Sequence, residues 1–229
     1  MFLLTSILLL FLCVKAALLT TNDVENLYDF YIETNGVNWK LFDPSRAWNF
    51  TSPNTTGTEP CSHEDENGDI VFGWEGVGCS YFCIFENSCN LTGLSLAGIG
   101  MTGHFPDSVG NFKHLLNLDL KQNELSGSLP SLLSEASLLE VLIVDNNQLS
   151  GAIPNSLMCS SILNSLSLNS NFLSSTLPSC TEGFLGKITS LVLYNNGLSG
   201  AIPSSLFLHP LVTLDLTSNR LNGTIPPSI

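Results

Sequence analysis

The sequence predicts an elongated solenoid of stacked coils, each with one short strand, preceded by a separate N-terminal cap. The main observation is an apolar pattern that recurs about every 24 residues through residues 91–229. A second is the segment 17–90, which holds all three tryptophans and does not follow that pattern. A third is a short apolar run at the very start of the chain. Together they divide the chain into segments 1–16, 17–90 and 91–229.

The apolar run at the start predicts a signal peptide. It extends from Met1 to Cys13, about the length of a signal-peptide core. A membrane span would need about 20 apolar residues. Small residues follow the run, and we place cleavage after Ala16, although no lysine or arginine precedes the run. A buried N-terminal helix is disfavoured, because the segment has no polar face for solvent.

Cysteines and glycan acceptors agree with export. Six of the seven cysteines remain once Cys13 is removed, and an even number in an exported chain favours disulfides over metal ligands. Cys83 and Cys89 lie in one short insert and are expected to pair. Cys159 and Cys180 fall on the outer side of adjacent coils, where the spacing allows a bridge or two free thiols. Four Asn-x-Ser/Thr triplets predict glycosylation at Asn49, Asn54, Asn90 and Asn222.

The net charge excludes several partners. The chain carries a formal charge of −13, and residues 17–90 hold 12 acids against 2 bases. Such a chain repels nucleic acid, anionic lipid and polyanionic carbohydrate. We therefore expect no nucleic-acid partner.

The apolar pattern repeats six times. Copies begin at residues 91, 115, 139, 163, 188 and 211, which gives spacings of 24, 24, 24, 25 and 23 residues. The second copy reads Leu115-x-x-Leu118-x-Leu120-x-x-Asn123-x-Leu125. A single coil cannot bury its own leucines, but stacked coils share one continuous core.

Each repeated position has a physical reason. Alternate apolar residues face one side of a short strand. The asparagine at the ninth position can donate and accept hydrogen bonds, so it can satisfy buried backbone groups of neighbouring coils. A glycine allows the second bend, and a proline fixes φ where the outer segment begins. Two copies deviate, with Ile99 in place of the asparagine and Ser175 in place of the glycine, and we interpret both as structural variation.

The most specific string is N-x-L-S-G-x-I-P, present at residues 147–154 and 196–203. It resembles the plant-type class of leucine-rich repeats, which includes receptor-kinase ectodomains, receptor-like proteins and polygalacturonase inhibitors, and which also occurs in protist surface proteins. The resemblance implies a leucine-rich-repeat solenoid, a right-handed superhelix with a parallel β-sheet on its concave face.

Residues 17–90 resemble the α-helical, disulfide-bonded N-terminal cap of that class. Asn22 and Glu25 form a capping-box-like helix start, and Asn35-Gly36 ends the helix. Within this cap, Trp39 and Trp48 are expected to cover the open apolar end of the first coil rather than to stack on carbohydrate.

One motif in the cap bears on how its cysteines pair. The string Trp74-Glu-Gly-Val-Gly-Cys79 matches the W-x-G-V-x-C of the class. The resemblance implies a disulfide between Cys61 and Cys79. The inserts around this motif depart from the compact plant cap.

No catalytic or metal-binding pattern is present. The four histidines, His63, His104, His114 and His209, lack metal-ligand spacing and lie near no candidate nucleophile. The acidic stretch 63–69 departs from a calcium-binding loop in the place of its glycine and lacks the closing glutamate. Nucleotide-binding and hydrolase motifs are also missing. We predict no metal, no cofactor and no enzymatic activity.

The predicted binding surface is the concave sheet. Residues interleaved with the strand leucines should point outward there, and repeat proteins bind partners through this face. Tyr194 is the aromatic residue of the set, which suits a binding hot spot. The alternative is that these side chains only solvate the sheet. The predicted binding residues are Asn117, Asp119, Lys121, Glu140, Ile143, Asp145, Ser167, Asn169, Val192, Tyr194, Asp215 and Thr217.

These features favour a secreted or cell-surface recognition module for a protein, peptide or glycan ligand, as a receptor-like ectodomain or secreted adaptor. One alternative is a secreted inhibitor of a wall-degrading enzyme, which would need several basic or aromatic concave residues. Another is a structural surface or matrix protein, which would have many more identical repeats.

The C-terminal end lacks a cap. The sixth copy stops at Ile229 with no capping segment after it. We therefore expect either a longer natural chain or end-to-end association through this edge. A membrane contact is expected only if a further C-terminal segment anchors the chain.

Overall fold

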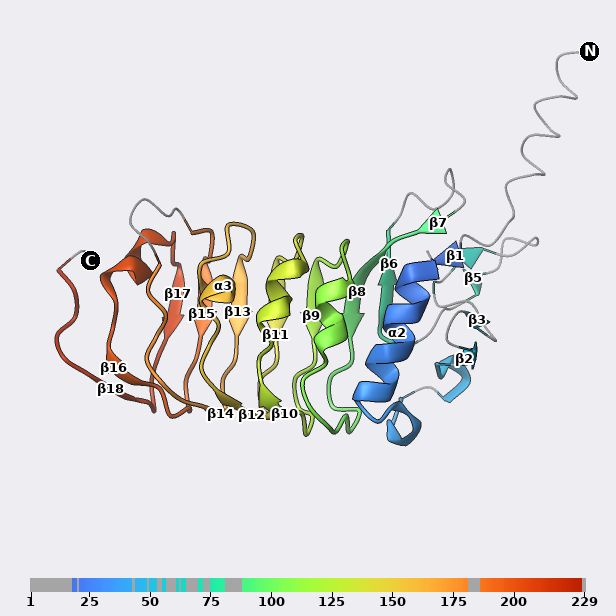
Figure 1. Ribbon diagram of the computed structural model, residues 1–229, viewed down its shortest axis with the longest axis horizontal. Helices are drawn as coiled ribbons and strands as arrows, with labels where there is room; N and C mark the ends of the chain where they lie inside the picture. Colours follow the sequence, from blue (N-terminus) through green and yellow to red (C-terminus); the bar gives the residue numbers. More distant parts are fainter. Residues whose placement is uncertain are drawn as a thin grey trace, which may run out of the picture.

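The computed structural model describes residues 18–19, 21–42, 44–48, 50–52, 55–56, 61, 63–64, 70–71, 75–80, 88–180 and 186–227. The protein is a right-handed solenoid whose coils follow one another along the long axis, with the cap at one end (Figure 1). The predicted signal peptide lies outside the described residues. So do the predicted glycan acceptors Asn49 and Asn54 and the predicted disulfide residue Cys83.

The cap contains one long helix and several short elements. Helix α2 spans Thr21–Glu33, so Asn22 is its second residue and not the cap predicted from its side chain. The chain leaves the helix through Asn35, which takes the left-handed φ of 58°. The remaining cap elements are β1 (Leu18–Leu19), η1 (Gly36–Asn38), η2 (Pro44–Arg46), β2 (Phe50–Ser52), β3 (Thr55–Thr56), β4 (His63–Glu64), β5 (Ile70–Val71), β6 (Val77–Cys79) and β7 (Ser88–Cys89).

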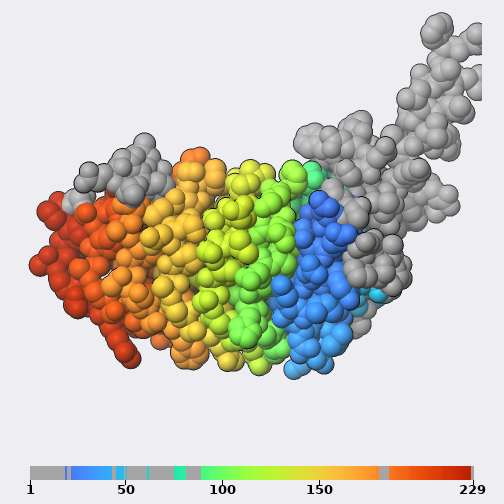
Figure 2. Space-filling view, viewed as in Figure 1, coloured from blue at the N-terminus to red at the C-terminus, as the bar shows by residue number. Residues whose placement is uncertain are grey.

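An aromatic cluster joins the cap to the first coil. Phe30 is fully buried, and its ring centroid lies 6.2 Å from that of Trp48 and 6.5 Å from that of Phe112 in the first coil. Trp48 is 6% exposed, and its indole N–H donates to the Glu75 carbonyl at 3.0 Å. Burial of this ring leaves no open face for a sugar. In Figure 2 the surface of α2 (blue) meets that of the first coils (green) directly.

The main sheet has seven strands in the order β17-β15-β13-β11-β9-β8-β6. Its register aligns Leu94, Leu118, Leu142, Leu166 and Leu191, so the same repeat position faces the core in each coil. Strand β6 pairs with β8 in antiparallel direction, which the sequence did not predict. The repeat strands are β8 (Leu91–Ser95), β9 (Asn117–Asp119), β11 (Val141–Ile143), β13 (Ser165–Ser167), β15 (Ser190–Val192) and β17 (Thr213–Asp215).

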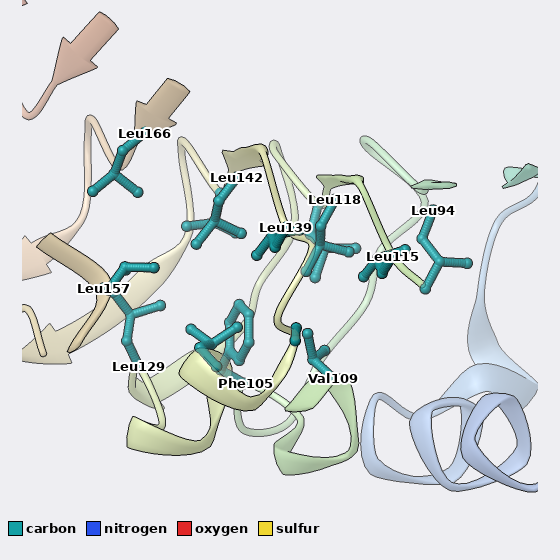
Figure 3. Close-up of a cluster of buried hydrophobic side chains, with 14 of the residues drawn as sticks. Leu94, Phe105, Val109, Leu115, Leu118, Leu129, Leu139, Leu142, Leu157 and Leu166 are labelled. Carbon is teal, nitrogen blue, oxygen red and sulfur yellow. The ribbon is translucent and has the colours of Figure 1, made fainter. Parts of the chain in front are cut away.

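The core is a continuous row of leucines between the sheet and the outer segments. Leu118, Leu142 and Leu166 are fully buried and point from the sheet toward Phe105 and Leu157 of the outer side (Figure 3). Each coil buries these side chains only because the next coil covers them, as the repeat pattern predicts.

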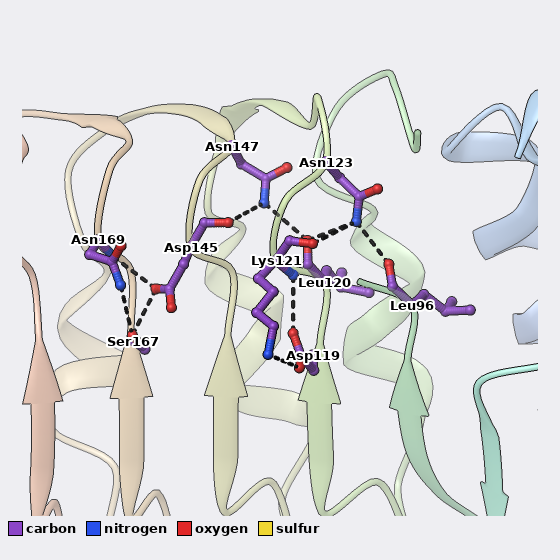
Figure 4. Close-up of polar contacts among 9 residues, drawn as sticks. All are labelled: Leu96, Asp119, Leu120, Lys121, Asn123, Asp145, Asn147, Ser167 and Asn169. Carbon is purple, nitrogen blue, oxygen red and sulfur yellow. Dashed lines mark hydrogen bonds and ion pairs between the residues drawn. The ribbon is translucent and has the colours of Figure 1, made fainter. Parts of the chain in front are cut away.

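The repeated asparagines bridge neighbouring coils. The Asn147 side-chain N–H donates to Leu120 O at 3.0 Å in the preceding coil (Figure 4). It also donates to Val144 O at 3.1 Å in its own coil. Its Oδ1 accepts from Leu125 N at 3.0 Å. The same arrangement recurs at Asn123, Asn171, Asn196 and Asn219. These bonds satisfy backbone groups that no strand partner reaches.

Two small lateral sheets follow the asparagines and were not predicted. They are β10-β12-β14 and β16-β18, and all of their strands pair in parallel. The bend glycine of each coil has a positive φ, as in Gly127 at 79° and Gly151 at 80°. Their bounds are β10 (Ser126–Ser128), β12 (Gln148–Gly151), β14 (Phe172–Leu173), β16 (Ser199–Ala201) and β18 (Arg220–Asn222).

Short helical turns form the outer side of the solenoid. Each begins after a repeat proline, where the fixed φ of proline suits helix entry. They are η4 (Asp107–Asn111), η5 (Ser131–Glu135), α3 (Asn155–Met158) and η6 (Ser204–Leu208).

Disulfides occur in both the cap and the repeats. Cys61 is bonded to Cys79, which is the pair implied by the family resemblance. Cys159 is bonded to Cys180, so the alternative of two free thiols does not hold. Cys89 is also disulfide-bonded, while Cys83, its predicted partner, lies outside the described residues.

Replacing Ser175 with glycine should stabilise the protein. Ser175 stands where the other coils have the bend glycine and adopts the same positive φ of 79°. A left-handed backbone costs a residue with a Cβ about 1–2 kcal/mol. We expect Ser175→Gly to raise the free energy of unfolding by about 1 kcal/mol in urea titrations.

The adjacent serine is the matched control. Ser174 has no positive φ, so Ser174→Gly should lower the free energy of unfolding by about 0.5–1 kcal/mol through added chain entropy. Equal effects of the two substitutions would contradict a strained backbone at Ser175.

Candidate ligand-binding surface

The concave sheet carries three aligned rows of outward side chains. The register places Asp119, Ile143, Ser167, Val192 and Asp215 in one row. Two residues further along each coil, Lys121, Asp145, Asn169, Tyr194 and Thr217 occupy equivalent positions of the repeat. Asn117 begins a third row, two residues before Asp119. Eleven of the twelve predicted binding residues belong to these rows.

The twelfth, Glu140, does not belong to them. It precedes β11 by one residue, and the register aligns Val141 with Asn117 and Ser165. The register therefore places Val141, which was missed, in the row of Asn117, and contact of the exposed Glu140 with a ligand stays a prediction. Counting the third position of every copy would have found Val141, because that position gives 93, 117, 141, 165, 190 and 213.

Asn169 is also less available than predicted. Its side chain is 6% exposed, although it lies on the sheet face. Its backbone N–H donates to Asp145 Oδ1 at 3.0 Å, and its Nδ2 donates to Ser167 Oγ at 3.2 Å (Figure 4). Asn169 thus supports its neighbours and offers little surface to a partner.

Two carboxylates, those of Asp119 and Asp145, lie near the middle of the sheet. Burial raises the pKa of Asp145, against hydrogen bonds from Ser167 and Asn169 that lower it. The nearby charge of Asp119 raises it further. Asp119 itself pairs with Lys121 at 3.0 Å between Oδ2 and Nζ. A cation from a partner would relieve the repulsion between the two acids.

Asp215 lies further along the sheet. The backbone N–H of Thr217 donates to its Oδ1 at 3.0 Å and the Thr217 hydroxyl at 2.7 Å. These hydrogen bonds lower the pKa of Asp215, first through the backbone contact. This carboxylate is therefore charged at neutral pH.

A hollow of about 520 Å³ lies on the sheet face beside the cap. Its lining includes Gly78 of β6 and Gly93 of β8, which are paired in the register. Val141 and Ile143 line it from β11, and Arg46 lines it from the cap. No sequence pattern indicates this hollow, because its lining comes from strands that only the fold brings together.

The residue before each bridging asparagine was also missed as a special position. Gln122, Asn146, Ser170, Asn195 and Ser218 all have a φ between 53° and 60°. This repeated left-handed residue turns the chain away from the sheet, and it limits which substitutions that edge of the concave face tolerates.

The described residues contain no cluster of three or more potential metal ligands. Within the same part of the chain, no helix is long and apolar enough to cross a membrane. Two predicted glycan acceptors are described, with Asn222 exposed and Asn90 partly buried.

The family model described as Leucine Rich Repeat matches residues 114–136, 138–160, 187–208 and 210–229. A curated relative, the LRR receptor-like serine/threonine-protein kinase GSO2 of Arabidopsis thaliana, is 37% identical over 54 residues. That segment is 24% of this chain and only 4% of the relative.

Solved structures resemble the whole fold. The ectodomain of the receptor kinase SOBIR1 from Arabidopsis thaliana has a TM-score of 0.67 and 26% identity, with 92% of this chain and all of that one covered. A chain of the BIR3–SERK2 complex from Arabidopsis thaliana has a TM-score of 0.64 and 31% identity, with 88% and 95% covered. The plant peptide hormone receptor RGFR1 in complex with RGF2 has a TM-score of 0.56 and 34% identity, with 59% and 22% covered.

Proposed function

We propose, from the membership of this chain in the plant-type leucine-rich-repeat proteins, that it is a non-catalytic recognition module of the cell exterior. It binds a protein or peptide partner through the concave sheet. The observation that carries this proposal is the set of aligned outward rows, which offers a partner polar, apolar and charged groups at regular spacing. Strands fixed by a continuous core present these groups with little loss of entropy on binding.

The partners of similar proteins support this class of ligand. RGFR1 is a peptide hormone receptor with its peptide, and BIR3 and SERK2 form a complex with each other. The chain spans only a small part of the kinase relative and of RGFR1, so their activities and ligands are not carried over. An extracellular or cell-surface location fits the disulfides and the ectodomain neighbours.

The composition of the concave rows disfavours the inhibitor alternative. Their described residues include one lysine, Lys121, and one aromatic residue, Tyr194. Inhibition of a wall-degrading enzyme through several cationic or aromatic residues of the inhibitor is therefore not the role that this face suits best.

We expect Tyr194→Ala to weaken peptide binding by about tenfold, since tyrosine is a frequent hot-spot residue. Asp119→Ala should weaken it by about threefold, because it removes one of the few charges on the face. Peptides selected from a random displayed library on the immobilised full chain serve as probes, and their affinity is measured by fluorescence anisotropy.

The control is Asn155→Ala on the outer side, where the exposed side chain is far from the sheet face. It should leave affinity unchanged. If both concave substitutions leave affinity unchanged while shortening residues 63–69 abolishes binding, recognition belongs to the cap and the proposal is wrong.

A further inference from the structure

The hollow beside the cap exists because two facing residues have no side chains. Gly78 and Gly93 are paired across β6 and β8, and both line the hollow. The other coils have a side chain at the position equivalent to Gly93, such as Asn117 or Val141. The concave sheet is thus deepened at this one place among the described strands.

The backbone does not require glycine at either position. Neither residue has a positive φ. A Cβ on Gly78 would come no closer than 3.5 Å to any atom, and one on Gly93 no closer than 3.9 Å. Glycine weakens a strand interior, and in strands it often marks a bulge, a tight bend or a place where a ligand or another backbone approaches closely. The register of β6 and β8 is irregular between Gly78 and Cys79, so Gly78 lies beside a bulge, and the open surface over Gly93 is the feature available to a ligand.

The walls of the hollow specify what fits above the glycines. Val141 and Ile143 form an apolar side, so an aromatic ring on the glycine floor would bury apolar surface against them.

Asp145 follows Ile143 by two residues, which places it roughly 7 Å further along the same coil at the usual strand rise. Asp119 and Asp145 are close enough for their charges to repel each other, and Lys121 forms an ion pair with Asp119. Arg46 adds a positive charge on the cap side of the hollow, so complementarity to a cation is confined to Asp145 and its neighbour Asp119.

We propose that this hollow binds an aromatic side chain of an extended peptide whose lysine or arginine, two residues away, reaches Asp145. Side chains two residues apart in an extended peptide lie on the same face, so both anchors can contact the sheet together. The inference rests on the proposed concave-face function and adds the place and the chemistry of one subsite.

The probe is the peptide Gly-Trp-Gly-Arg-Gly-amide with fluorescein on its N-terminal amine, titrated with the full chain by anisotropy. Matched peptides carry glutamate in place of arginine or serine in place of tryptophan, and each should bind at least about tenfold more weakly. Gly93→Leu fills the hollow and should weaken binding of the first peptide by about tenfold. Asp145→Asn keeps the shape of the side chain and should weaken it by about threefold.

Ser190→Leu is the matched control, because Ser190 occupies the row position of Gly93 in the fifth coil. It should change the affinity by less than about twofold. Gly93→Ala, which meets no close atom, gives a second variant with a smaller but measurable loss and guards against misfolding of Gly93→Leu.

No binding of the first peptide, equal binding to Gly93→Leu, or a preference for the glutamate peptide would each overturn this inference. The proposed function is tested separately by the library peptides and Tyr194→Ala. If those peptides respond to Tyr194→Ala but not to Gly93→Leu, concave recognition stands and only this subsite is wrong. If no library peptide responds to any concave substitution, the proposed function fails as well.

Discussion

Replacing Asn147 with leucine is expected to lower the free energy of unfolding by about 3 kcal/mol. Asn147 is 6% exposed and links two coils through both ends of its amide. Leucine has a similar volume, so the loss comes from hydrogen bonding and little from a cavity. Urea unfolding followed by circular dichroism measures it.

The loss is dominated by one buried donor. Without Asn147 Oδ1, the Leu125 N–H has no replacement acceptor among the contacts of the structure. A buried unsatisfied donor costs about 1–3 kcal/mol. The two carbonyls are less affected, since Leu120 O still accepts from Asn123 and Val144 O still accepts from Asn171.

Asn117→Leu is the control for this substitution. Asn117 is exposed on the concave face, and a surface change of this kind alters stability by about 0.5 kcal/mol or less. A similar loss in both variants would contradict the bridging role of the repeated asparagine.

Replacing Phe30 with alanine is expected to destabilise the protein by about 4 kcal/mol. The ring is fully buried between Trp39, Trp48 and Phe112, with centroids 6.1–6.5 Å away. Its removal leaves a cavity at the junction of α2 with the first coil, which rigid surroundings fill only in part. Loss of the cap contact should also increase hydrogen exchange of the Leu94 and Leu118 amides.

Phe42→Ala provides the matched control, because the Phe42 side chain is 81% exposed. It should change the stability by about 0.5 kcal/mol or less. If Phe30→Ala has no larger effect than Phe42→Ala, or if exchange rises only far from the cap, the aromatic junction does not hold the cap on the first coil.

The roles of the repeat positions could be predicted because each role depends on nearby residues in the sequence or on the same position in the neighbouring coil. A leucine alternating with polar residues must face inward whichever neighbour covers it. The bridging role of Asn147 follows likewise, since identical coils present the same unpaired groups to each copy. The row position of Val141 could also have been counted from the repeat.

Other features depend on contacts between segments of the chain that the repeat pattern does not specify. The bond between Cys159 and Cys180 depends on how two outer segments approach each other, and the sequence alone left it open. The antiparallel pairing of β6 depends on the path of an irregular cap. Asn169 is buried by neighbouring residues, although its position in the repeat is outward.

The repeat pattern is sufficient to derive the solenoid, its inward leucines, its bridging asparagines and the face on which the outward rows lie. That Gly78 and Gly93 face each other and deepen this surface beside Val141 and Ile143 is visible in the folded chain alone. The physical reason is that periodicity fixes the direction of a side chain along one strand, whereas strand pairing between a cap and a repeat depends on long-range contacts.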